Sequence, residues 1–233
     1  MNRFRSMLNY FSKGELLLCL SSVFAVVVSF CLFDRSNYLT LVASLIGVIS
    51  LIFNAKGNPF GQFLMIIFSM LYGWISFTFS YYGEMMTYLG MTMPMAVVAL
   101  ISWMRNPYNG NQSEVKIHRL SRREWGVMWI LTIIVTIGFY FILRYFSTAN
   151  IIPSTVSVTT SFVAVYLTLK RSPYYAVGYA ANDIVLIVLW VLAAIQDVSY
   201  LSVVVCFAAF LANDIYGFLN WRRMEKRQTG SLS

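Results

Sequence analysis

Residues 174–195 read YYAVGYAANDIVLIVLWVLAAI, an apolar run that contains a single charged side chain, Asp183. A bilayer core about 30 Å thick takes about 20 apolar residues in a helix, so this run predicts a membrane-spanning helix. Seven further stretches of the same character occur along the chain. The predicted spans are residues 15–33, 38–55, 60–82, 85–104, 125–146, 152–169, 174–195 and 199–221.

The composition agrees with this count of spans. Of the 233 residues, 59% are hydrophobic and 11% are charged, a balance that a water-soluble domain of this size cannot present on its surface. We therefore predict an all-α polytopic membrane protein with eight transmembrane helices. The first span is too long for a signal-peptide core and is interpreted as a retained helix.

The sequence shows no pattern for catalysis or metal binding. The three cysteines fall in apolar stretches, and His118, the only histidine, stands in a basic loop. Nucleotide-hydrolysing loops, nucleophile elbows and metal-ligand helix motifs are all missing from the sequence. We predict no cofactor, no metal site and no enzyme activity.

The basic residues are strongly segregated. With eight spans, 15 of the 17 lysines and arginines fall on one side of the membrane, and Arg35 and Arg144 fall on the other. By the positive-inside rule, the side with the 15 basic residues is cytoplasmic, so both termini are predicted to lie in the cytoplasm. The predicted location of the protein is the inner (cytoplasmic) membrane. This distribution explains the net charge of +8 without a nucleic-acid partner.

A repeat underlies the spans: two helices joined by a short basic loop, a tight acidic turn, and a third helix that ends in Trp and Arg. Three spans and one linker helix return the chain to its starting side, so the copies run parallel in a 3+1+3 core. Trp103 and Trp221 are interpreted mainly as interfacial anchors, and Pro94 predicts a kink. The predicted organisation has five parts. Residues 1–37 hold an N-terminal interfacial segment (1–11) and an extra transmembrane helix, and they are followed by a first repeat (38–106), a basic cytoplasmic loop with the linker helix (107–151), a second repeat (152–223) and a cytoplasmic tail (224–233). Glu225, in the tail, is predicted to lie at the surface.

Two intramembrane motifs carry the candidate site. Ala-Asn-Asp-Ile occurs at 181–184 and again at 212–215, and a Trp follows each Asp by seven positions. Because buried ionisable groups are costly in lipid, they indicate function, and a spacing of two turns puts each Asp and Trp on one face. We predict one central cavity that binds sugar hydroxyls and base edges, although these residues could instead fix helix packing. The predicted substrate-binding residues are Asn182, Asp183, Asn213, Asp214, Trp190, Tyr179, Tyr216, Asn220, Trp74, Tyr72 and Gln62.

Several short motifs resemble a known family. They include Asn-Ala-Lys-Gly at 54–57, Tyr-Gly-Glu-Met at 82–85, Pro94-Met95 and Trp221-Arg222. In this order, and on a 3+1+3 plan, they resemble the Pnu family of vitamin and nucleoside transporters. The resemblance implies a fold similar to that of the SWEET sugar transporters, a homo-trimer, and facilitated diffusion in which a cytosolic kinase traps the substrate by phosphorylation.

The chain departs from the nicotinamide riboside branch of that family where the ligand should sit. Pro94-Met95 is followed by Ala96 in place of an amide, and Val165-Tyr166 stands where that branch has Gln-Trp. Cation–π attraction is strongest over Trp, so a site with fewer indoles suits a pyridinium cation less well. We therefore predict a nucleoside or deoxyribonucleoside as substrate, with nicotinamide riboside as the alternative. A further alternative is a non-transporting membrane scaffold or sensor that binds a partner through the basic loop 106–123.

Overall fold

The computed structural model describes residues 10–78, 82–148 and 150–230. Within these residues, eight helical segments are long and apolar enough to cross a membrane, so the predicted eight-helix fold is confirmed. Most of the interfacial segment predicted at 1–11 lies outside the described residues. The elements are α2 (Lys13–Phe33), α3 (Tyr38–Ala55), α4 (Pro59–Thr78), α5 (Tyr82–Thr87), the π-helical turn η1 (Tyr88–Thr92), α6 (Met93–Met104), β1 (Pro107–Tyr108), β2 (Asn111–Val115), α7 (Arg122–Tyr145), α8 (Ile151–Leu169), α9 (Tyr175–Ala194), η2 (Val198–Tyr200) and α10 (Leu201–Gly230).

Local chemistry fixes where several helices begin. Ser12 and Glu15 form a capping box at the start of α2, and Ser121 and Glu124 form another at the start of α7. Asn37 caps α3 by accepting the backbone N–H of Thr40 at 3.2 Å. These side chains satisfy helix N–H groups that have no partner within the helix, so each span starts close to its predicted position.

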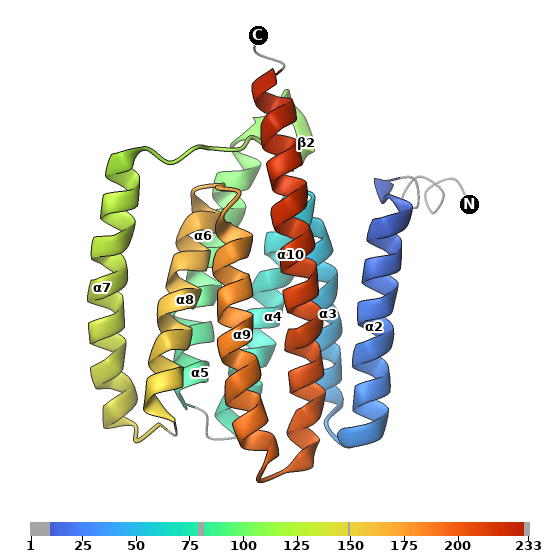
Figure 1. The fold of residues 1–233 in the computed structure, drawn as a ribbon, viewed down its shortest axis with the longest axis vertical. Coiled ribbons are helices and arrows are strands. Elements are labelled where there is room, and N and C mark those ends of the chain that lie inside the picture. Colours follow the sequence, from blue (N-terminus) through green and yellow to red (C-terminus); the bar gives the residue numbers. More distant parts are fainter. Residues whose placement is uncertain (1–9, 79–81, 149, 231–233) are drawn as a thin grey trace.

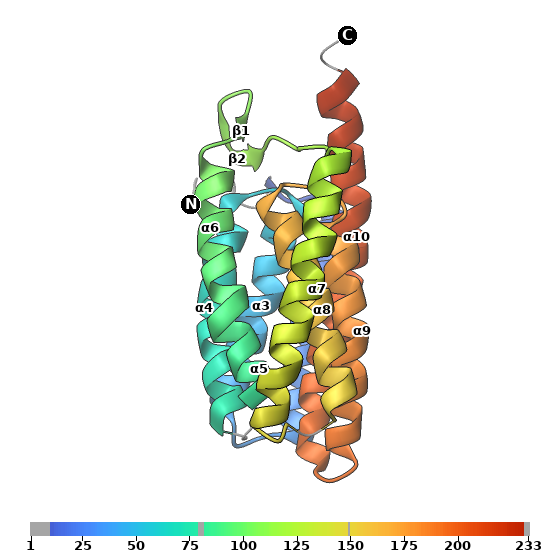
Figure 2. The same ribbon diagram turned by 90° about the vertical axis from the view of Figure 1, so that its left-hand side faces the viewer.

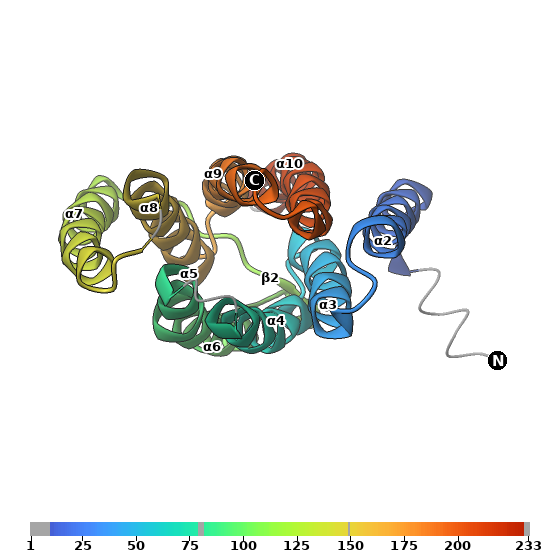
Figure 3. The same cartoon turned by 90° about the horizontal axis from the view of Figure 1, so that it is seen from below.

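Six spans form two rows that face each other (Figures 1 and 3). The first row contains α3, α4 and the continuous segment α5–η1–α6, and the second row contains α8, α9 and α10. Packing of α3 on α10 and of α6 on α8 closes the two rows into a ring. The remaining helices lie outside the ring, α2 against α3 and α10, and α7 against α8.

Small residues set the spacing within the ring. A Cβ atom added to Gly178 of α9 would lie 2.8 Å from the Cα atom of Ala164 in α8. On the other side of the ring, a Cβ atom at Gly47 of α3 would lie 2.3 Å from the ring of Phe210 in α10. Helices in membranes associate through such close backbone approaches.

The fourth span is interrupted near Pro94. Proline has no N–H to donate to the carbonyl four residues earlier, at Gly90, and the chain passes through the π-helical turn η1 just before it. The predicted distortion therefore takes the form of a π turn. It places Tyr88 and Thr92 toward the interior of the ring, where both are buried.

The end of the molecule where α2 starts and α10 finishes, called the basic end below, carries a feature that the sequence did not predict. Strands β1 and β2 form a hairpin there, with a turn at Asn109-Gly110 in which both residues have positive φ (Figure 2). Gln228, on the extension of α10 past the predicted span, accepts the N–H of Ile117 at 2.9 Å and donates to the carbonyl of Val115 at 3.1 Å. The basic loop is thus folded onto α10.

Glu225 is placed differently from the surface position predicted for it. It is buried, and its carboxylate pairs with Arg119 of the loop at 2.6 Å and with Arg222 one turn earlier in α10. At the opposite end of the bundle, here the far end, Asp197 accepts the N–H of Ser199 at 2.9 Å and starts η2. That hydrogen bond lowers the pKa of the Asp197 carboxyl.

Candidate functional site

Two carboxyl groups meet at the centre of the ring. Asp183 of α9 and Asp214 of α10 are both buried and line one cavity. The Oδ2 atom of Asp183 has no hydrogen-bond partner among the described residues. Two ionised carboxyl groups repel strongly in a low-dielectric interior, so a cation or a shared proton must stabilise this pair.

Asn182 is held at the edge of the same cavity by helix α8. Its Oδ1 atom accepts hydrogen bonds from the hydroxyls of Thr160 at 2.9 Å, Ser161 at 2.9 Å and Ser157 at 3.3 Å. The hydroxyl-rich sequence of α8 therefore fixes the orientation of an amide, in addition to allowing close helix contact. The amide nitrogen is the donor that remains for another group.

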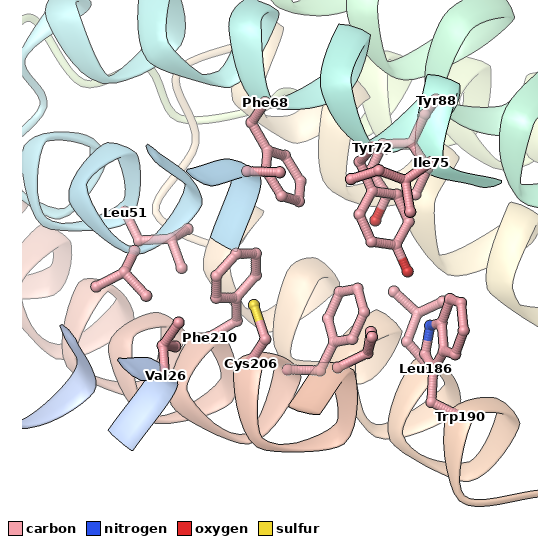
Figure 4. Packing of buried hydrophobic residues seen from close by; sticks show 14 of the residues in the cluster. Val26, Leu51, Phe68, Tyr72, Ile75, Tyr88, Leu186, Trp190, Cys206 and Phe210 are labelled. Carbon is pink, nitrogen blue, oxygen red and sulfur yellow. The ribbon is translucent and has the colours of Figure 1, made fainter. Parts of the chain in front are cut away.

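Aromatic side chains from both rows cover the cavity. Figure 4 shows Phe68, Tyr72 and Tyr88 of the first row facing Trp190 and Phe210 of the second. Ring centroids are 4.5 Å apart for Tyr72 and Tyr88, 5.5 Å for Phe68 and Phe210, and 6.3 Å for Tyr72 and Trp190. Phe68, Tyr88, Phe210 and Tyr179 supply flat apolar surfaces next to the two carboxyl groups, and Tyr72 and Trp190 lie beyond them.

The central cavity is small. Measured as the space open to the centre of a water-sized sphere, its volume is about 20 Å³, enough for about one water molecule. A second cavity of about 80 Å³ by the same measure lies toward the far end, between α5, α8 and α9, and Trp190 lines it. Trp190 contacts Tyr72, and Tyr72 contacts Tyr88, which lines the central cavity; these rings therefore separate the two spaces.

At the basic end, two tryptophans close the ring from inside. The indole N–H of Trp103 in α6 donates to the carbonyl of Thr168 in α8 at 2.9 Å, and that of Trp221 in α10 donates to the carbonyl of Asn54 in α3 at 2.8 Å. Both side chains are fully buried, with ring centroids 5.3 Å apart. The interpretation of these residues as interfacial anchors is wrong, because they lie in the packed interior.

The structure brings only part of the predicted site together. Asn182, Asp183, Asp214 and Tyr179 line the central cavity, and Tyr72 and Trp190 lie beside it. The remaining predicted residues make contacts elsewhere. Asn213 donates to Ser22 of α2 at 2.9 Å, Tyr216 donates to Glu15 of α2 at 2.8 Å, Asn220 donates to the carbonyl of Ala55 at 2.8 Å, Gln62 donates to Asn54 at 2.8 Å, and Trp74 is 57% exposed on the outside of α4.

Sequence reasoning also missed residues that the structure places at these cavities. Phe68, Tyr88 and Thr92 line the central one, and Glu84 lines the one toward the far end. Glu84 is the acidic residue of the tight turn predicted in the first repeat, on the outer side of the membrane, but it is buried in the first turn of α5. Its place in a Tyr-Gly-Glu-Met motif at a span boundary was the signal available.

Comparison with known proteins agrees with this architecture. The sequence pattern of the family described as nicotinamide mononucleotide transporter matches residues 37–223. The chain belongs to this transporter family. A curated member from Neisseria mucosa, called nicotinamide riboside transporter PnuC, is 28% identical over 203 residues, which cover 85% of this chain and 77% of that protein. A protein of the same name from Haemophilus influenzae is 23% identical over 193 residues, 82% of each chain.

Solved structures extend the likeness to three dimensions. A crystal structure described as that of the vitamin B3 transporter PnuC matches with a TM-score of 0.82 and 26% identity, covering 94% of each chain. As a member of the nicotinamide mononucleotide transporter family, the protein is a multi-pass membrane transporter and not an enzyme, as the sequence predicted. The resemblance to Pnu transporters is confirmed, whereas its deoxyribonucleoside branch gains no support.

Proposed function

We propose that this protein is a permease for nicotinamide riboside. The observation that carries the proposal is the relationship across nearly the whole chain to two curated proteins and one solved structure that bear this type of name. The alternative stated from the sequence thus replaces a neutral nucleoside as the preferred substrate.

The charges in the ring support a cationic substrate. Asp183 and Asp214 line the central cavity, Glu84 lines the other, and no Lys or Arg among the described residues lines either one. Nicotinamide riboside carries a positive pyridinium ring, which can supply the cation that the carboxyl pair needs in place of a shared proton. A neutral nucleoside does not supply it, and the phosphate of a mononucleotide would meet carboxyl groups with no basic partner.

The sequence argument against a pyridinium ring relied on missing indoles. Phe68, Tyr88, Phe210 and Tyr179 provide aromatic faces around the carboxyl pair, and Trp190 provides an indole at the cavity toward the far end. Such faces attract cations, and Tyr and Phe do so less strongly than Trp. In the proposed complex, Asp183 and Asp214 accept from ribose hydroxyls or face the cation, and Asn182 donates its amide N–H.

We further propose that uptake occurs by facilitated diffusion, with the basic end of the molecule in the cytoplasm. The repeats 38–106 and 152–223 move against each other during transport, and a cytosolic kinase traps the substrate by phosphorylation. A homo-trimer in the inner membrane is part of the same proposal. A central cavity of about 20 Å³ is too small for a nucleoside, so the helices must separate to admit a solute of this size. A cysteine placed at Ser113 should be protected from impermeant reagents added outside intact cells; labelling there would refute this orientation.

The decisive test of the substrate is calorimetric titration of the purified protein. The ligands are nicotinamide riboside, nicotinamide mononucleotide, thymidine, deoxyadenosine, uridine, thiamine and riboflavin. Tight binding of nicotinamide riboside alone supports the proposal. Tight binding of a deoxyribonucleoside, with no binding of nicotinamide riboside, would overturn it. A separate assay of substrate uptake into liposomes that contain no kinase distinguishes a permease from a scaffold.

A further inference from the structure

Glu84 occupies an unusual position near the far end of the ring. The preceding Gly83 packs so closely against α7 that an added Cβ atom would lie 2.6 Å from Cδ2 of Leu143. This close approach seats the first turn of α5 against its neighbours and leaves the Glu84 side chain pointing into the cavity toward α8 and α9. Only 8% of Glu84 is exposed to solvent.

The Glu84 carboxyl group is incompletely satisfied there. Its Oε2 atom has no hydrogen-bond partner among the described residues. No Lys or Arg in the described part of the chain forms an ion pair with it. A buried carboxylate without a partner is costly, so this position favours a ligand that brings a positive charge.

The rest of the cavity indicates what kind of cation fits. Trp190 and the aliphatic Leu189 and Ala193 of α9 line it together with Glu84. An indole next to a carboxylate recognises a flat organic cation, since the ring attracts the charge through its face and the carboxylate neutralises it. At about 80 Å³ by the measure used above, the cavity has room for several water molecules, which a ring entering it would displace.

We propose that Glu84 and Trp190 form a second substrate subsite, toward the far end, that binds the pyridinium ring of nicotinamide riboside before it reaches the central carboxyl pair. This inference rests on the proposed function. Trp190 of the far-end cavity contacts Tyr72, which contacts Tyr88 of the central cavity, so these rings must shift for a solute to pass from the subsite to the central cavity. Glu84 selects for the charge of the ring, and Trp190 selects for its flat shape.

Two ligands of similar shape and different charge can show whether Glu84 recognises the charge of the ring. Nicotinamide riboside is a cation, whereas its dihydro form has nearly the same outline and is neutral. Glu84→Gln should weaken binding of nicotinamide riboside by about tenfold or more and leave binding of the dihydro form nearly unchanged. Asp197→Asn is the matched control, since it removes one negative charge at the same end, outside the cavity, and should alter neither affinity.

Titration calorimetry of the parent and both variants gives clear outcomes. If Glu84→Gln weakens the affinity for both ligands equally, or does not weaken the affinity for nicotinamide riboside, the subsite is overturned and the proposed function stays intact. A parent protein that binds neither ligand refutes the proposed function and the subsite with it. If Glu84→Gln does not yield folded protein, the affinities of the parent protein for the two ligands are compared instead. Equal affinity of the parent for the charged and the neutral ligand also overturns a charge-selective subsite.

Discussion

Replacing Asp183 with alanine tests the central site most directly. The Oδ2 atom of this side chain has no hydrogen-bond partner among the described residues, so it has the most to gain from a bound substrate. A hydrogen bond to a charged group contributes about 1.5–3 kcal/mol, and about 1.4 kcal/mol is a tenfold change in Kd. We therefore expect Asp183→Ala to weaken nicotinamide riboside binding by about ten- to a hundredfold.

The two motifs provide matched controls. Ile184 and Ile215 directly follow the two aspartates, and each is 54% exposed on the outside of its helix. Ile184→Ala and Ile215→Ala should therefore leave the Kd unchanged. Thermal unfolding in detergent shows whether each variant is folded, and calorimetry gives the affinity. If Asp183→Ala and Asp214→Ala both bind as tightly as the parent, the carboxyl pair has a packing role and the site assignment fails.

Three further predictions concern stability, measured as thermal unfolding in detergent. Trp221→Phe removes the indole N–H that donates to the Asn54 carbonyl, and it leaves a small cavity because the phenyl ring is smaller than the indole. It should cost about 1–3 kcal/mol, and an unchanged midpoint would contradict this. Gly178→Ala forces α9 away from Ala164 and should destabilise by about 1–3 kcal/mol, whereas Gly138→Ala, with open space around it, should not. Glu225→Ala should also destabilise the fold, because it leaves Arg119 and Arg222 without their shared partner; wild-type stability would contradict this.

The spans could be predicted from the sequence because hydropathy and length alone determine them. Predicted and observed boundaries agree within a few residues for most helices, such as 38–55 for α3. The last helix is the exception, since α10 continues to Gly230 past the predicted end at residue 221. That extension is polar, and it is stabilised by the hairpin at 107–115, a contact across more than a hundred residues that no local pattern reveals.

The candidate site was predictable only in part, as the two identical motifs demonstrate. Asn182 and Asn213 occupy the same position beside an aspartate, yet the first bonds to α8 at the cavity and the second bonds to Ser22 of α2. The helix period places each asparagine about 100° round from its aspartate. Which neighbour lies in that direction depends on the packing of the extra helix, which the motif does not encode.

Hydropathy likewise could not separate a tryptophan in the interface from one in the core. Trp103 and Trp221 stand at the ends of spans, where an anchor is expected, and only the opposing carbonyls of Thr168 and Asn54 reveal their role. Glu84 was misplaced for a related reason. An acidic residue at a span boundary is usually solvated, and its burial depends on the close approach of Gly83 to Leu143.

The reciprocal tryptophan bonds have a consequence for how the basic end can open. Each indole belongs to one row and holds the first helix of the other, so separating the rows at this end breaks both bonds together. At about 1 kcal/mol each, the two bonds together contribute about 2 kcal/mol against separation of the rows, a factor of about thirty in that equilibrium. The free energy of substrate binding can offset a difference of this size. If the transporter opens at this end, removing either indole N–H should therefore make that opening easier.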